Sequence, residues 1–96
     1  MNIELEQDVY DRVVKVIADA LRIKPEKIKE DSTVFLDLGA ESIDVLDIRF
    51  RLEKEFGIKI KDGEIIESLG DELSLDDINE IFTTRSTVEF IQKKLN

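Results

Sequence analysis

Residues 37–60 read DLGAESIDVLDIRFRLEKEFGIKI, and this stretch decides the fold. Apolar side chains recur within it at three- and four-residue steps, which is the period of an α-helix. The period begins near Ser42 and ends at Phe56, and Gly57 then occupies the position that favours a left-handed C-terminal cap. We therefore expect a helix over residues 42–56.

This helix carries two apolar stripes. At about 100° per residue, one narrow stripe forms the predicted core face and consists of Val45, Ile48, Leu52 and Phe56. A second stripe lies about a quarter to a half turn away and consists of Ile43, Leu46 and Phe50. One buried face does not require both stripes. The second stripe is therefore either buried between neighbouring helices or left free for a partner or cargo.

Upstream of this helix, the sequence predicts a helix followed by a long loop. One apolar stripe runs over residues 3–22 and consists of Leu5, Val9, Val13, Ile17 and Leu21, with Ala20 beside it. Pro25 then discourages continuation of the helix. The loop, residues 24–41, carries apolar anchors that predict a packed segment, namely Ile28, Val34, Phe35, Leu36 and Leu38.

Downstream, capping signals predict three further helices. Asp62 is placed to cap a short helix that ends near Gly70. Ser74 and Asp77 have the spacing of a capping box and predict a helix over residues 75–82. No stretch has a convincing strand pattern, because the alternation after residue 57 is too short.

Ser86 and Glu89 repeat the capping signal before a last helix, over residues 87–95, whose core side is Val88, Ile91 and Leu95. The predicted fold class is therefore all-α, a four-helix bundle with a long first loop and a short extra helix. Its core is expected to include Val9, Val13, Ile17, Leu21, Val45, Ile48, Leu52, Phe56, Ile78, Val88 and Ile91.

Length and composition limit what the chain can be. Its 96 residues suffice for one domain, residues 1–96, with a modest core. No apolar run is long enough for a membrane span, and no secretory signal is visible. The sequence contains no cysteine, which is compatible with a cytoplasmic protein.

The chain is strongly acidic, with a net charge of −9. This charge disfavours nucleic-acid binding, which needs a basic face. It either serves solubility alone or steers the protein toward basic surfaces of partners. Residues 62–82 contain no basic residue and carry eight acidic ones, which are Asp62, Glu64, Glu67, Asp71, Glu72, Asp76, Asp77 and Glu80.

Ser42 stands at a glycine-marked turn where the central helix begins, yet nothing nearby activates it. The chain has no histidine, and a serine hydroxyl is a weak nucleophile without a base. The turn is not G-x-S-x-G, and neither a calcium loop nor a His/Cys cluster is present. We therefore expect no catalytic residue and no metal ligand. Ser42 is either an ordinary helix N-cap or a point of attachment.

The turn, the serine, the following helix and the order of the helices together resemble the acyl carrier protein family. The family's hallmark is Asp-Ser-Leu after a Leu-Gly turn, and this chain has LGAESID over residues 38–44. The match is strong from Asp37 to Ile60, and the resemblance covers nearly the whole chain. It implies an all-α bundle of acyl-carrier type.

The resemblance implies that Ser42 accepts a 4′-phosphopantetheine arm from coenzyme A. A separate phosphopantetheinyl transferase performs the reaction, and the arm's thiol then carries acyl groups as thioesters. The chain itself would be no enzyme, because the chemistry belongs to the cofactor. Its role would lie in fatty-acid, lipid or related biosynthesis.

The implied partners are the transferase and acyl-loading, ketosynthase or acyltransferase enzymes with basic docking surfaces, and we expect a monomer. Glu41, Asp44 and Asp47 would offer such enzymes an electrostatic handle. The full set of candidate contacts is Asp37, Leu38, Glu41, Ile43, Asp44, Leu46, Asp47, Phe50, Arg51 and Lys54.

The chain departs from the family at several positions. Glu41 and Ile43 replace an aspartate and a leucine, and Arg49, Arg51 and Lys54 stand in a helix that is usually almost purely acidic. These cations should weaken docking to partners selected for an acidic helix. Arg49 lies at the edge of the core stripe, where its stem can pack while its head reaches water.

Residues 62–74 resemble an insertion, similar to that of specialised carriers of very long acyl chains for lipid A. The insertion either widens an acyl pocket through Ile65, Ile66 and Leu69 or is a surface elaboration. Two other functions remain open for the chain. It could be an aminoacyl or peptidyl carrier, or an unmodified acidic adaptor that binds a protein through Leu46 and Phe50.

Overall fold

The computed structural model describes residues 3–96, with side chains from residue 6 onward. Within this range the chain is helical, and its one β-bridge pairs Thr33 with Thr83. The elements are α1 (Ile3–Leu21), the 3₁₀ turn η1 (Pro25–Lys27), α2 (Ser42–Phe56), α3 (Glu64–Glu67), α4 (Leu75–Ile81) and α5 (Thr84–Leu95). Four longer helices and the short α3 confirm the predicted all-α bundle with an extra helix.

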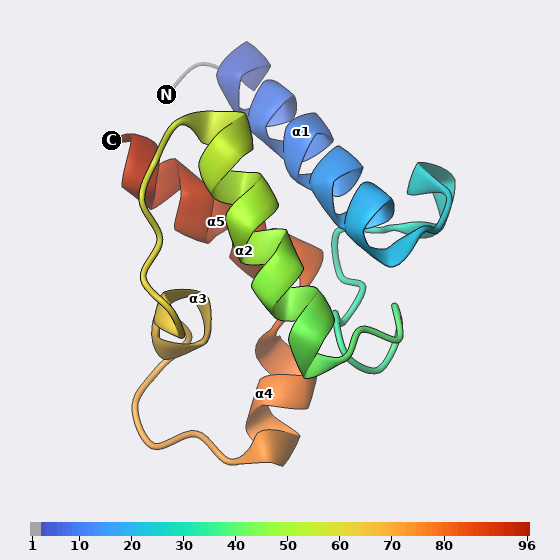
Figure 1. The fold of residues 1–96 in the computed structure, drawn as a ribbon, viewed down its shortest axis with the longest axis vertical. Coiled ribbons are helices and arrows are strands. Elements are labelled where there is room, and N and C mark those ends of the chain that lie inside the picture. The colour runs from blue at the N-terminus through green and yellow to red at the C-terminus, as the bar shows by residue number, and fades with distance from the viewer. Residues whose placement is uncertain (1–2) are drawn as a thin grey trace.

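Helix α1 is the element that holds the bundle together, since it packs against both α2 and α5 (Figure 1). Helices α1 and α2 run in opposite directions, with α5 behind α2 in this view. Among the described residues, no helix combines the length and apolar character needed to cross a membrane.

The core follows the predicted apolar stripes. Seven of the expected core residues are buried, namely Val9, Val13, Ile17, Ile48, Leu52, Val88 and Ile91. Four others are half-buried and pack against them, namely Leu21, Val45, Phe56 and Ile78. The Leu5 side chain lies outside the described side chains. Gly57 ends α2 with φ 64°, as the sequence predicted.

The predicted helix starts after residue 60 need correction. Helix α3 begins after Gly63, whose φ of 80° turns the chain, so Asp62 is not its cap. Helix α5 begins three residues earlier than predicted, because Thr83 is its N-cap and accepts a hydrogen bond from the Ser86 N–H. Ser86 is therefore the third helical residue of the capping box, whose hydroxyl accepts from the Thr83 N–H at 2.9 Å. The box at Ser74 was predicted correctly.

Two apolar residues that we expected to pack inward do not. The side chain of Leu36 is 67% exposed, because the loop is anchored by its neighbours instead. Leu95 is 43% exposed, since it occupies the last turn of α5, where the helix extends past the core. Of the other loop anchors, Ile28 and Val34 are buried, and Phe35 and Leu38 are half-buried and pack against the core.

Candidate functional site

Ser42 opens α2 and is exposed to solvent. It is the first helical residue, because the N-cap is Glu41, so Ser42 is not the ordinary N-cap that one interpretation expected. The Asp44 carboxylate accepts a hydrogen bond of 2.8 Å from the Glu41 N–H and so fixes the start of the helix. Among the described residues, none forms a hydrogen bond with the Ser42 hydroxyl. The hydroxyl is thus free to react and lies where the helix dipole favours an anion.

The turn before Ser42 is held by a small set of hydrogen bonds. The Thr33 N–H donates to the Asp37 carboxylate at 2.9 Å, and the Asp37 N–H donates to the Thr33 hydroxyl at 2.9 Å. The Ala40 N–H then donates to the Val34 carbonyl. Gly39 adopts φ 73°, a conformation that L-residues rarely take, although space around it is open. The predicted role of Gly39 in a tight turn is therefore correct.

The loop is also fastened to the start of α5. The Val34 N–H donates to the Phe82 carbonyl at 2.9 Å, and the Thr84 N–H donates to the Ser32 carbonyl at 3.1 Å. The rings of Phe35 and Phe82 meet edge to face, with centroids 5.6 Å apart. Because Phe82 is 1% exposed, these contacts tie the loop to the core and give Ser42 a fixed position.

A cavity of about 220 Å³ lies beside Ser42, between α2 and the segment around α3. Its walls are largely apolar and are formed by Phe35, Ser42, Val45, Leu46, Arg49, Asp62, Gly63, Ile65 and Ile66. Ile65 and Ile66 are two of the three pocket residues predicted from the sequence. The third, Leu69, packs against the core and is not among the lining residues. Phe35, Val45 and Asp62 could not be identified as lining residues from the sequence, because they lie far apart in the chain.

The two apolar stripes of α2 have different environments. Ile48 and Leu52 of the first stripe are buried. The second stripe is free, since Ile43 is 71% exposed, Leu46 41% and Phe50 53%. The alternative in which neighbouring helices bury both stripes is therefore wrong. An exposed apolar stripe of three large side chains is typical of a binding surface.

The other candidate contact residues fall into two groups. Glu41, Arg51 and Lys54 are exposed, although Arg51 is paired with Asp47 at 3.1 Å. Asp37 and Asp44 serve the turn and the helix start, and Leu38 packs against the core. Asp37 is exposed as well, whereas Asp44 and Leu38 are half-buried and therefore less accessible to a partner.

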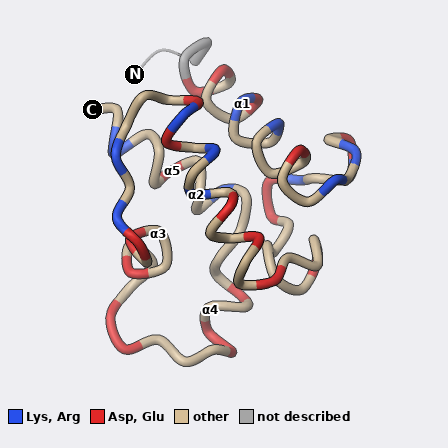
Figure 2. The backbone as a smooth tube through the Cα atoms, in the orientation of Figure 1, with Lys and Arg blue, Asp and Glu red and all other residues tan. Residues whose placement is uncertain are grey.

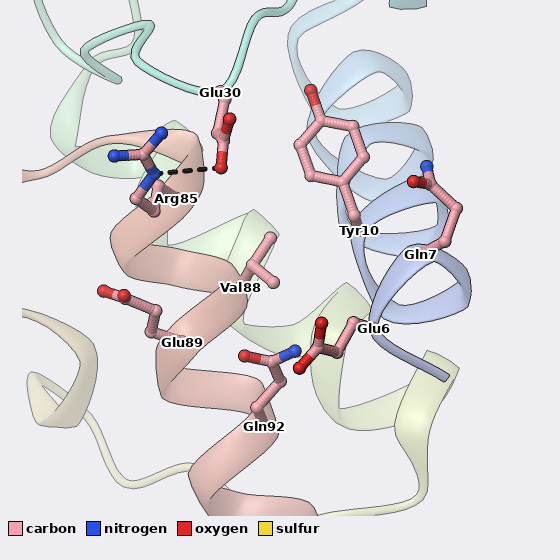
Figure 3. A pocket seen from close by; sticks show the side chains of 8 residues that line it. All are labelled: Glu6, Gln7, Tyr10, Glu30, Arg85, Val88, Glu89 and Gln92. Carbon is pink, nitrogen blue, oxygen red and sulfur yellow. Dashed lines mark hydrogen bonds and ion pairs between the residues drawn. The ribbon is translucent and has the colours of Figure 1, made fainter. Parts of the chain in front are cut away.

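A larger, more polar hollow of about 510 Å³ lies between α1 and α5, away from Ser42 (Figure 3). Glu30 and Arg85 form an ion pair of 3.0 Å at its edge, and both are exposed. Burial raises the pKa of the Tyr10 phenol, and the nearby Glu30 and Asp11 carboxylates add to this effect. Neither Ser42 nor the exposed stripe of α2 borders this hollow, so it is not part of the site around the serine.

The arrangement around Ser42 fits a phosphopantetheine group on three observations. Among the described residues, the Ser42 hydroxyl is exposed and unbonded, and the first two N–H groups of α2 have no hydrogen-bond partner. A largely apolar cavity lies alongside. An α-helical bundle with an exposed serine at a helix start is compatible with a carrier domain that receives a covalent arm.

Comparison with known proteins gives the family. Residues 11–71 match the family described as Phosphopantetheine attachment site. Acyl carrier proteins of Buchnera aphidicola subsp. Acyrthosiphon pisum, strains Tuc7 and APS, are each 35% identical to the chain over 88 residues. The similarity covers 92% of this chain and 94% of each relative. The chain therefore belongs to the acyl carrier protein family, whose domains bear a phosphopantetheine attachment site.

Membership settles the class of function. The chain is a carrier that bears covalent 4′-phosphopantetheine, and it is not an enzyme. Its role is that of an acyl carrier, which phosphopantetheinyl transferase and acyl-handling enzymes recognise.

Proposed function

We propose that Ser42 bears the phosphopantetheine arm and that the chain presents acyl thioesters to enzymes of fatty-acid, lipid or related biosynthesis. The observation that carries this proposal is the exposed Ser42 hydroxyl at the start of α2, beside an apolar cavity. Ser74 is also exposed at a helix start, but its hydroxyl accepts a hydrogen bond from the Asp77 N–H at 3.1 Å. Among the described residues, none forms a hydrogen bond with the Ser42 hydroxyl.

Attachment needs no base from this chain. The Ser42 oxygen forms a bond to the pantetheine-side phosphorus of coenzyme A, the bond to adenosine 3′,5′-bisphosphate breaks, and the transferase takes the serine proton. The phosphodiester then lies in the positive field at the start of α2. The arm supplies a thiol, which the cysteine-free chain lacks.

Partner enzymes would dock on the exposed part of α2. Ile43, Leu46 and Phe50 offer an apolar stripe, and the carboxylate of Glu41 flanks it at the serine end. A partner with a basic rim and an apolar centre complements this surface. The exposed Lys54 near the far end of α2 disfavours partners whose basic rim extends along the whole helix.

Several finer points belong to the same proposal. We propose that residues 1–96 form one carrier domain, because α1, α2 and α5 share one core. We also propose that this domain is monomeric and cytoplasmic. We also propose that Ile65 and Ile66 shelter the acyl chain, with Leu69 supporting them from the core side. A carrier of unusually long acyl chains, as the insertion suggests, would need this wall to move outward.

Intact mass after co-expression with a broad-specificity phosphopantetheinyl transferase tests the attachment. We expect the wild type to gain the mass of one phosphopantetheine and Ser42→Ala to gain none. Ser74→Ala is the matched control, since it removes another exposed serine at a helix start, and it should gain the full mass. Modification of Ser42→Ala, or none of the wild type, would contradict the proposal. The second outcome would favour an unmodified adaptor.

Offering acyl-loading and aminoacyl-loading enzymes to the modified protein then separates the two kinds of cargo. We expect acyl loading, because the cavity beside Ser42 is largely apolar. Exclusive aminoacyl loading would instead indicate a peptidyl or aminoacyl carrier.

A further inference from the structure

Helix α3 forms part of the wall of the Ser42 cavity, although it has only four residues. Ile65 and Ile66 of α3 line the cavity, and so does Gly63 just before the helix. The first residue of α3, Glu64, therefore stands between lining residues on both sides. Because any displacement of Glu64 moves this wall with it, the contacts that fix Glu64 bear directly on the width of the cavity.

The Glu64 carboxylate uses its two oxygens for different contacts. Its Oε1 accepts a hydrogen bond of 2.8 Å from the Lys61 N–H, which fixes the turn before α3. Its Oε2 lies 2.6 Å from the Lys94 ammonium of α5. Both Glu64 and Lys94 are half-buried, so water and salt screen this pair less than a fully exposed one. The pair therefore ties the start of α3 to α5.

Few other polar contacts fix the position of α3. The chain before it is bound to α2 at Ile60, whose carbonyl accepts from Arg49 Nη1 at 2.8 Å and whose N–H donates to the Glu53 carboxylate at 2.7 Å. The Arg49 head is thus bound to the chain and does not extend into water as the sequence predicted. Among the described residues, the hydrogen bonds of α3 itself all lie within residues 61–70. The pair with Lys94 is therefore the one polar contact in the described part of the chain that joins α3 to another helix.

The cavity has to widen before it can enclose a long acyl chain. Its volume of about 220 Å³ is below the ~300–1,000 Å³ that is typical of ligand pockets. Helix α2, which lies beside α3 in Figure 1, buries Ile48 and Leu52 in the core, so α3 is the side that yields. An ion pair at 2.6 Å leaves little room for displacement. A shift of α3 that widens the cavity therefore weakens its contact with Lys94.

We propose that Lys94 is a positioning residue that sets how long an acyl chain the cavity shelters. Its pair with Glu64 favours the narrow cavity, which suits short chains. A long chain has to select the state in which α3 has moved and the pair is broken, so it is sheltered less than it would be without the pair. This inference rests on the proposed function, in which Ser42 bears the arm and the cavity receives the chain.

Cleavage of acyl thioesters by hydroxylamine tests the proposal, because an acyl chain inside the cavity shields its thioester from attack. Each protein carries either butanoyl or dodecanoyl on the arm, and the ratio of the dodecanoyl to the butanoyl cleavage rate is compared. Lys94→Met keeps an apolar stem and removes the charge. We expect it to lower this ratio roughly two- to fivefold, as a partly exposed ion pair allows, and to leave the butanoyl rate unchanged.

Lys93→Met is the matched control, since Lys93 is exposed in the same turn of α5 and forms no ion pair among the described residues. It removes the same charge and should keep the wild-type ratio, as should Lys94→Arg, which retains the charge. Glu64→Gln keeps an oxygen for the Lys61 N–H and should lower the ratio as Lys94→Met does. In high salt, the difference between the wild type and Lys94→Met should shrink, because salt screens the pair.

Three results would overturn the inference. The first is an unchanged or increased ratio in Lys94→Met. The second is a rise of both cleavage rates in Lys94→Met, which would mean that the pair only holds the fold together. The third is an equal decrease of the ratio in Lys93→Met, which would mean that net charge is responsible. Failure of attachment to Ser42 appears separately as an absent mass increase, so it is distinguishable from a failure of this inference alone.

Discussion

Helix α2 and the acidic segment of residues 62–81, whose first residues line the Ser42 cavity opposite α2, are held in different ways. Helix α2 buries Ile48 and Leu52 in a core shared with α1. In the acidic segment, Ile65 is the one apolar residue that is buried, and α4 has no buried residue. Elements with few buried apolar contacts open at lower free energy than the core. Ser42 therefore lies on the wall formed by α2, which we call the firm wall. The acidic segment forms the opposite wall, which we call the movable wall.

Charge follows the same division. Figure 2 shows acidic positions along the α3–α4 segment, whereas Lys and Arg gather around the far end of α2 and the chain after it. Repulsion among the carboxylates of residues 62–82, which no basic residue of that segment offsets, weakens the movable wall further. One ion pair opposes this, since Lys94 of α5 contacts Glu64 at 2.6 Å.

The largest expected effect comes from truncating a buried side chain of α2. Leu52→Ala should lower the free energy of unfolding by about 2–5 kcal/mol, because Leu52 is 0% exposed and the neighbouring side chains cannot close the gap. Phe50→Ala, which truncates a residue 53% exposed on the same helix and removes its contact with the Arg49 guanidinium, should change it by less than about 1 kcal/mol. Chemical denaturation followed by circular dichroism measures both. Similar losses for the two variants would mean that the second stripe of α2 is structural.

Truncation in the movable wall should cost less. Ile65→Ala should lower the free energy of unfolding by about 2 kcal/mol, the low end for such changes, because the short α3 can settle inward. Native-state hydrogen exchange should show the loss first at the amides of residues 67–69, which bond within this turn. Leu75→Ala, at a position 69% exposed, is the control and should leave exchange there unchanged. A uniform loss of protection over the whole chain would instead show that both walls unfold together.

Helices α1 and α2 could be predicted from sequence, because the period of the apolar residues indicates which face of a helix is buried. The helix over residues 42–56 was predicted with both its bounds, and the helix of residues 3–22 was predicted to within one residue. Two apolar stripes on one helix, however, do not show which of them a neighbour covers. That depended on the positions of α1 and α5, which no local pattern encodes.

The helix starts after residue 60 were predicted less well, because in two places neighbouring residues are equally suited to the capping position. Asp62 and Gly63 both suit a helix start, and only the positive φ of Gly63 decided between them. Thr83 and Ser86 are both capping residues, and the pairing of Thr33 with Thr83 favoured the earlier start. The contacts of the Arg49 guanidinium with the Ile60 carbonyl and the Phe50 ring could not be foreseen, because the helix pattern does not show where the chain after α2 runs.

Two glycines allow a direct comparison of the segments that lead into α2 and α3. Gly39 and Gly63 adopt φ 73° and 80°, and an added Cβ would meet no close neighbour at either. Each change to alanine should cost about 1 kcal/mol from conformation alone. Gly39→Ala should lower global stability, since that turn is bonded to the core, whereas Gly63→Ala should mainly increase exchange in α3. Changes to asparagine are the controls and should cost less, because asparagine tolerates this conformation. An equal loss of global stability in both alanine variants would contradict the difference between the two segments.

The smallest effect concerns the ion pair that holds α3 against α5. The contact with Lys94, aided by a hydrogen bond from the Lys61 N–H, lowers the pKa of Glu64. A carboxyl group whose pKa is lower in the folded state stabilises the fold above its unfolded pKa, about 4.3 for glutamate. That stabilisation is lost as the pH falls through the folded value. Glu64→Gln should therefore be less stable than the wild type at pH 7, by less than about 1 kcal/mol, and the difference should vanish in acid.

Loss of a negative charge alone would have the opposite sign in a protein of net charge −9. Glu80→Gln supplies the control for this, since it removes an exposed carboxylate from the same acidic segment and should be neutral or slightly stabilising at pH 7. Thermal unfolding at pH 7 and below pH 4 distinguishes the two contributions. If Glu64→Gln matched Glu80→Gln at both pH values, the pair with Lys94 would contribute nothing. The apolar contacts of Ile65, Ile66 and Leu69 would then hold α3 against the rest of the bundle.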